Sequence, residues 1–122
     1  MLVYRLENQD GVGPFYGGPS GSTLDRVAGL MYRYSDEMSV PRGDLLPHHL
    51  LEVYAFVDVE SFSFLPDAVF KQLEVFGFSV VVFYVANDYC HYVDQKQVLF
   101  RRDKAKVVER LQRRFGRWVK EK

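Results

Sequence analysis

The sequence has little of what would support covalent cross-links, membrane insertion or dedicated nucleic-acid binding. Its only cysteine, Cys90, cannot form a disulfide within the chain. Its 16 basic and 16 acidic residues cancel, whereas proteins that coat DNA are strongly basic, so we expect no direct sequence-specific DNA binding. The longest apolar run, residues 78–86, is much shorter than the ~20 residues of a membrane helix. The opening MLVYRLENQDG lacks the apolar core of a signal peptide. We therefore expect a cytoplasmic protein with no membrane contact.

The residues that bind metals or act as nucleophiles are also too sparse. His48 and His49 are adjacent, so they share no helix face, and the remaining candidates are Cys90 and the distant His91. This is not the ligand spacing of a zinc site, and we predict no metal site. Cys90 and His91 lack a third group that would orient them as a catalytic pair, and a surface thiol beside a surface histidine is the simpler interpretation.

Aromatic residues, in contrast, are abundant, at 16% of the chain. With 122 residues the chain is long enough for one domain (1–122), which buries roughly two thirds of its unfolded surface. In a domain of this size most aromatic side chains belong to the core and its rim, and only a few remain to contact a ligand or partner.

The hydrophobic pattern predicts an α+β fold: a small mixed or antiparallel sheet with flanking helices. In the first strand Val3 and Arg5 face one way, and Tyr4 and Leu6 the other. The run 78–86 is apolar on both faces and predicts an interior strand. A loop rich in glycine and proline spans residues 8–22. The predicted strands are 2–7, 54–57, 78–86 and 97–101, and the predicted helices are 23–34, a short one from 47, 59–65, 66–76 and 103–120.

The zero net charge conceals a strong polarity. Residues 101–122 contain ten basic and three acidic residues, which gives them a net charge of +7. Residues 1–100 contain six basic and thirteen acidic residues, which gives them a net charge of −7. On the predicted C-terminal helix, the arginines would contact an acidic protein or an RNA-bearing complex. A solvated face that neutralises the acidic body is at least as good an explanation, and the acidic body could itself cover a basic surface of a partner. The predicted partner-binding residues are Arg110, Arg113, Arg114 and Arg117.

Three segments carry a resemblance to a known group. They are VYRLE followed by GVGPFYGG, then YAF at 54–56 before an acid-capped helix, and then GFSVVVFYV followed by QKQVLF. In this order they resemble small phage and prophage proteins, which in turn resemble the ADP-ribosyltransferase fold. The resemblance covers roughly residues 1–18 and 76–106, and residues 20–53 contribute nothing to it.

The resemblance implies a site for NAD in a cleft between two short sheets. Arg5 would anchor the dinucleotide, with Tyr16 or Phe15 at the side of the cleft and Tyr54 or Phe56 stacked on the nicotinamide. Gln97 would occupy the catalytic position, where an active transferase has glutamate. A neutral amide lacks the charge stabilisation that such a carboxylate supplies, typically a few kcal/mol. Without the resemblance, Arg5 is simply a residue of an edge strand, paired with Glu7 or another acid.

Two functions follow from these observations. The first is a phage-encoded inhibitor that binds a host protein or ribonucleoprotein. The target we expect is a component of host defence, so that the protein would act like an anti-CRISPR inhibitor. The second is a mono-ADP-ribosyltransferase that uses NAD to modify a host target. Gln97 in place of glutamate, together with the acidic body, favours the binder.

Overall fold

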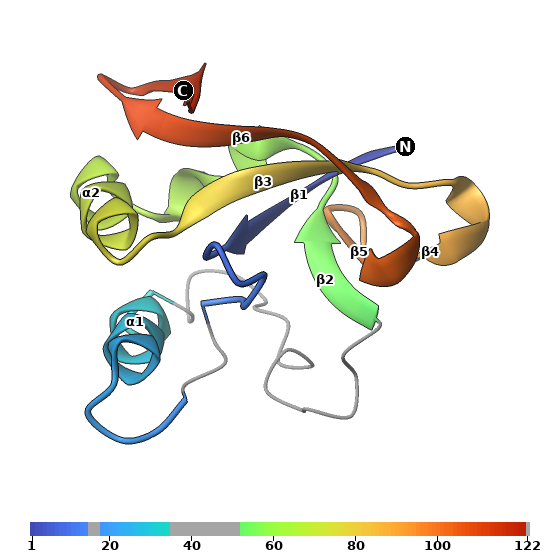
Figure 1. The fold of residues 1–122 in the computed structure, drawn as a ribbon. Helices are drawn as coiled ribbons and strands as arrows, with labels where there is room; N and C mark the ends of the chain where they lie inside the picture. Colours follow the sequence, from blue (N-terminus) through green and yellow to red (C-terminus); the bar gives the residue numbers. More distant parts are fainter. Residues whose placement is uncertain (15–17, 35–51, 122) are drawn as a thin grey trace.

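The computed structural model describes residues 1–14, 18–34 and 52–121. In these residues seven strands form one sheet in the order β4-β5-β2-β1-β3-β6-β7, and every neighbouring pair is antiparallel (Figure 1). The α+β prediction is confirmed, with a wholly antiparallel sheet. The strands are β1 (Leu2–Glu7), β2 (Glu52–Phe56), β3 (Ser79–Tyr84), β4 (Cys90–Tyr92), β5 (Gln97–Arg101), β6 (Lys106–Arg114) and β7 (Arg117–Lys120).

The helices pack on one face of this sheet. Helix α1 (Thr23–Tyr32) begins at Ser22, whose side chain accepts a hydrogen bond from the Asp25 amide. Helix α2 (Asp67–Val75) follows a 3-10 turn, η4 (Val59–Phe64), and both helices lie toward the same end of the sheet (Figure 1). Their apolar sides meet the sheet in a first core, whose buried members are Leu6, Val27, Met31, Phe56, Phe62, Leu65, Val69, Phe70, Leu73, Phe78, Val80, Val82 and Leu111.

The other face of the sheet carries a second core. The sheet curves strongly around this core. Phe83 of β3 and Phe100 of β5 have ring centroids 5.4 Å apart, although β1 and β2 lie between their strands. In a flat sheet three strand spacings would separate them by roughly 14 Å. The curvature also lets a short 3-10 turn, η6 (Arg102–Lys104), connect β5 to β6 across three intervening strands. The buried members of this second core are Val3, Val53, Ala55, Val81, Phe83, Val85, Val98 and Phe100.

The side-chain alternation predicted for the first strand is confirmed. Val3 belongs to the second core and Leu6 to the first, while Tyr4 packs against the first. β3 is paired on both sides, with β1 and β6, so residues 79–84 form an interior strand as predicted. The predicted strand 97–101 is β5, and a second short 3-10 turn, η5 (Asn87–Tyr89), leads into β4, which the sequence did not predict.

The prediction of a C-terminal helix over residues 103–120 is wrong. These residues form η6 and the β6–β7 hairpin. Apolar residues such as Val107 and Leu111 recur at helical spacing, but the valines of this segment also suit a strand. As a strand, β6 supplies hydrogen-bond partners to the side of β3 that faces away from β1. Of the short helix predicted from residue 47, residues 47–51 lie outside the described part of the chain, and β2 begins at Glu52.

Candidate interaction site

The β6–β7 hairpin ends in an unusual loop. Only Phe115 and Gly116 separate the two strands, and both have positive φ, 50° and 72°. Positive φ at both central residues defines a type I′ turn, in which asparagine followed by glycine is strongly preferred. A phenylalanine in the left-handed region costs roughly 1–2 kcal/mol relative to the right-handed one. The sequence thus places a bulky residue where the turn disfavours it.

No packing compensates for this conformation. The Phe115 side chain is 100% exposed, and Phe115 is the only non-glycine residue with positive φ in the described part of the chain. Strained residues of this kind concentrate at functional sites, because selection for another property retains them. The loop Arg114–Arg117, which we call the hairpin loop, is therefore the strongest candidate for contact with a partner.

The predicted partner-binding arginines occupy different surroundings. Arg113 is bonded to Asp67 at 3.1 Å and lies over the Trp118 ring at 5.1 Å. Arg114 is hydrogen-bonded to Glu74, and this bond raises the pKa of its guanidinium.

Arg117, also in the hairpin loop, is exposed. Among the described residues its side chain forms no hydrogen bond or ion pair. Arg110 lies further along β6, opposite Val81, on the face of the second core. The structure therefore brings Arg113, Arg114 and Arg117 together at the hairpin end, and leaves Arg110 apart from them.

A groove opens beside the hairpin, between η4, the start of α2 and β7. Its volume is about 260 Å³. The aromatic rings of Phe62 and Phe70 lie against Trp118 with centroid distances of 6.1 and 5.0 Å, and Arg113 lies over the same indole. We call this the Trp118 groove, and its lining residues are Val59, Glu60, Phe62, Ser63, Leu65, Pro66, Asp67, Phe70, Arg113 and Trp118.

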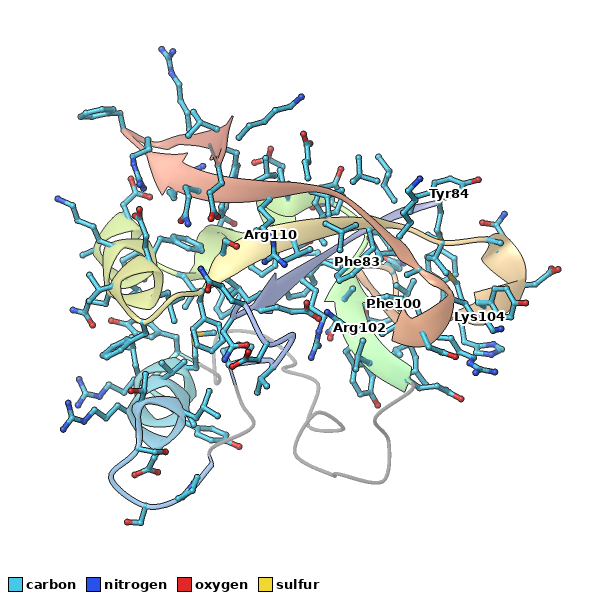
Figure 2. The ribbon with its side chains drawn as sticks, viewed as in Figure 1. Phe83, Tyr84, Phe100, Arg102, Lys104 and Arg110 are labelled. Carbon is cyan, nitrogen blue, oxygen red and sulfur yellow. The ribbon has the colours of Figure 1, made fainter. Side chains whose placement is uncertain are left out.

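Arg5, the residue predicted to anchor NAD, is engaged within the fold. Its Nε donates to Glu7 at 2.9 Å, and its Nη1 donates to the Tyr54 carbonyl at 2.9 Å. The alternative interpretation is confirmed in its ion pair with Glu7. Its edge position is wrong, because β1 is paired on both sides, with β2 and β3. Arg102 completes the cluster, since its Nε and Nη2 donate to the same carboxylate at 2.7 and 2.9 Å. Figure 2 shows Arg102 beside Phe83 and Phe100, over the curved face.

Of the other residues assigned by the resemblance, Tyr54 lies next to Arg5, and its main-chain carbonyl accepts the hydrogen bond from Nη1. Gln97 is buried, and its side chain donates to Asp94 at 3.1 Å. Phe56 lies in the first core, with its ring 4.9 Å from that of Phe62, so it is on the opposite face of the sheet from Arg5. Phe15 and Tyr16 lie outside the described residues.

Sequence reasoning does not single out Phe115 or Trp118 as contact residues, because it predicts a helix over residues 103–120 and therefore no hairpin loop there. One signal was available: Gly116 lies between segments rich in valine and arginine, and glycine suits the second central position of a hairpin turn. For Arg102, no local signal existed, because its partner Glu7 is 95 residues away.

Comparison with known proteins identifies the family. The family model described as Bacteriophage T4 Y00F protein matches residues 1–114. The chain belongs to this family. It is a small phage protein, as its sequence suggested, and the match ends one residue before Phe115.

No curated protein and no solved structure matches this Y00F-family chain. The likeness to the ADP-ribosyltransferase fold is therefore not supported by any known structure. The described strands also form a single sheet, whereas that likeness implies two. Between residues 1 and 121, apart from the gaps at 15–17 and 35–51, no helix is long and apolar enough to span a membrane. In the same ranges no three His, Cys, Asp or Glu residues are grouped in a way that could hold a metal ion.

Proposed function

We propose that this phage protein binds and inhibits a host protein, and that the hairpin loop makes the central contact. The observation that carries the proposal is Phe115, whose ring is wholly exposed in a backbone conformation that disfavours it. Aromatic and arginine side chains dominate the binding energy of protein interfaces, usually where they enter a pocket of the partner. Phe115 with Arg117 beside it is such a pair.

The charge around the loop favours a protein over a nucleic acid. Proteins that bind nucleic acid engage several phosphates with unpaired basic side chains. Here Asp67 and Glu74 neutralise Arg113 and Arg114, so the excess positive charge beside Phe115 rests on Arg117. We infer that the target presents an apolar pocket with an acidic group at its rim.

Membership of a phage family supports a host target inside the infected cell. Among host proteins, we propose a component of the defence machinery, such as a CRISPR effector or another ribonucleoprotein, acting in the cytoplasm. This choice of target rests on the phage origin, and the chemistry of the loop adds only that the recognised surface is apolar and acidic.

A capture experiment with matched variants tests the proposal. The full-length protein, Phe115→Asn and Val93→Asn are each immobilised and exposed to host lysate, and bound proteins are quantified by mass spectrometry. Asparagine suits the left-handed position, so Phe115→Asn preserves the turn and removes the ring. Val93 is an exposed apolar residue next to β4, at the opposite edge of the sheet, and so serves as the control.

We expect one host protein to be captured in stoichiometric amount by the full-length protein and by Val93→Asn, and at least about tenfold less by Phe115→Asn. Equal capture by Phe115→Asn would remove the hairpin loop from the interface. Absence of any stoichiometric partner would refute the binding function itself.

NAD-dependent ADP-ribosylation of a host target remains the alternative that the resemblance implies. It has less support, because the side chains of Arg5 and Gln97 are bonded to Glu7 and Asp94 within the fold. Incubation with labelled NAD and lysate tests it, with Arg5→Ala and Gln97→Glu as variants. Labelled protein that is lost in Arg5→Ala and increased in Gln97→Glu would favour the enzyme; no labelling and no NAD binding would exclude it.

A further inference from the structure

The Trp118 groove has the size and lining of a receptor for one large side chain. Its volume of about 260 Å³ is below the range of roughly 300–1,000 Å³ that is usual for small-molecule sites. The half-buried indole of Trp118 supplies the accessible apolar surface, and the buried rings of Phe62 and Phe70 pack behind it. An aromatic side chain would find a ring contact there of the kind that Trp118 already makes with Phe62 and with Phe70.

The rim of the groove is acidic and hydrophilic. Glu60 and Ser63 are both exposed at its edge. Asp67 also lines the groove but is already bonded to Arg113. Among the described residues the Glu60 carboxylate forms no hydrogen bond or ion pair. The groove thus combines an aromatic floor with one carboxylate available to a cation.

The hairpin loop of the same chain has the complementary chemistry. Phe115 supplies an exposed aromatic ring, and Arg117 supplies an exposed guanidinium that has no partner among the described residues. The loop does not fill its own groove, since the Phe115 side chain is 100% exposed. A second copy of the chain can therefore provide what the groove lacks.

We infer that the protein forms a symmetric dimer in which Phe115 of each copy enters the Trp118 groove of the other, with Arg117 beside Glu60. Loop and groove adjoin on one hairpin, since Trp118 is paired with Arg113 and the next pair, Arg114 with Arg117, borders the loop. A reciprocal exchange about a two-fold axis closes the assembly at two copies.

The dimer uses the loop that the proposed function assigns to the host target, so the two bindings compete for Phe115. The contact is confined to two loops and two grooves, which places it at the small end of protein interfaces. We therefore expect a dissociation constant between about 1 and 100 µM, with the monomer released on dilution or on binding to the target.

The test is a concentration series of the full-length protein by light scattering after size exclusion, with Phe115→Asn, Ser63→Arg and Ser20→Arg. Ser63→Arg places bulk and positive charge at the groove and leaves the loop intact. Ser20→Arg makes the same change at an exposed turn before α1 and serves as the control. Circular dichroism of each variant establishes that it is folded.

The full-length protein and Ser20→Arg should pass from monomer to dimer over this range, and Phe115→Asn and Ser63→Arg should stay monomeric. An equimolar mixture of the two monomeric variants should dimerise, because one supplies an intact groove and the other an intact loop. Trp118, the only tryptophan, should report that mixing through its fluorescence. A full-length protein that stays monomeric, a Ser63→Arg variant that dimerises, or a mixture that does not would overturn the dimer.

Host-target capture separates this inference from the proposed function. Ser63→Arg should capture the target as well as the full-length protein does, because its loop is unchanged. Loss of the dimer with retained capture supports both proposals. A dimer with no captured target supports the dimer alone.

Discussion

Glu7 and Arg102, 95 residues apart, form a two-bonded ion pair at the curved face of the sheet. The Glu7 side chain is completely buried, and Arg102 donates to both of its oxygens while lying 5.5 Å from the centre of the Phe83 ring. Arg5 donates to the same carboxylate. Glu7 therefore binds Arg5 on its own strand and also Arg102 in η6, the turn that connects β5 to β6. The bond to Glu7 raises the pKa of Arg102, so its guanidinium stays protonated at every pH at which the protein is handled.

Replacing Glu7 should strongly destabilise the protein. Glu7→Gln keeps the shape but removes the buried negative charge to which both Arg5 and Arg102 are bonded, and breaking a buried pair costs about 3–5 kcal/mol. Because Arg102 is partly exposed, we expect about 3 kcal/mol, measured by urea unfolding. Glu109→Gln removes an exposed pair with Lys120 and should cost less than about 1 kcal/mol. Equal effects of the two substitutions would contradict the central role of Glu7.

Gly11 should tolerate alanine less well than Gly21 does. Both have similar positive φ, 77° and 78°, so the backbone penalty is nearly shared. A Cβ on Gly11 would lie 2.6 Å from Nη2 of Arg102, and that guanidinium is held by Glu7; a Cβ on Gly21 would meet nothing within 4 Å. Gly11→Ala should therefore lower the free energy of unfolding by at least about 1 kcal/mol more than Gly21→Ala does. Equal losses would mean that Arg102 moves aside freely.

Phe115→Asn should make the protein more stable while weakening its binding. Asparagine relieves the left-handed strain and suits the type I′ turn, so we expect the free energy of unfolding to rise by about 0.5–1 kcal/mol. Phe115→Ala keeps a Cβ in the strained position and should show almost no gain. Thermal or urea unfolding of the two variants distinguishes these effects. A large loss of stability in Phe115→Ala would show instead that the ring supports the fold.

Cys90 should react slowly with alkylating reagents. Partial burial raises the pKa of its thiol above 9.0, and its Sγ lies 3.7 Å from the Ala86 carbonyl. Since the thiolate is the reactive form, the rate of reaction with iodoacetamide should keep increasing beyond pH 9.0. Mass spectrometry over a pH series measures this rate, with urea-unfolded protein as the reference. A midpoint below that of the unfolded protein would contradict the assignment.

Much of the fold was predictable from local sequence. The alternation of residues 2–7, the apolar run of β3 and the helical patterns of residues 23–34 and 66–76 each specify an element through contacts within a few residues. The ion pair between Arg5 and Glu7 was predictable for the same reason, because residues two apart on a strand share a face.

Tertiary structure decided the rest. Val107, Leu111 and Trp118 recur at helical spacing, and only the hydrogen bonds that β6 makes with the outer side of β3 select the strand. That choice turned a predicted basic helix into a hairpin, exposed Phe115 at its loop and placed Trp118 beside Phe62 and Phe70. The sequence by itself determined which residues were apolar, basic or able to turn. The hydrogen bonds that β3 requires, and the curvature that lets Arg102 reach Glu7, determined which of them meet.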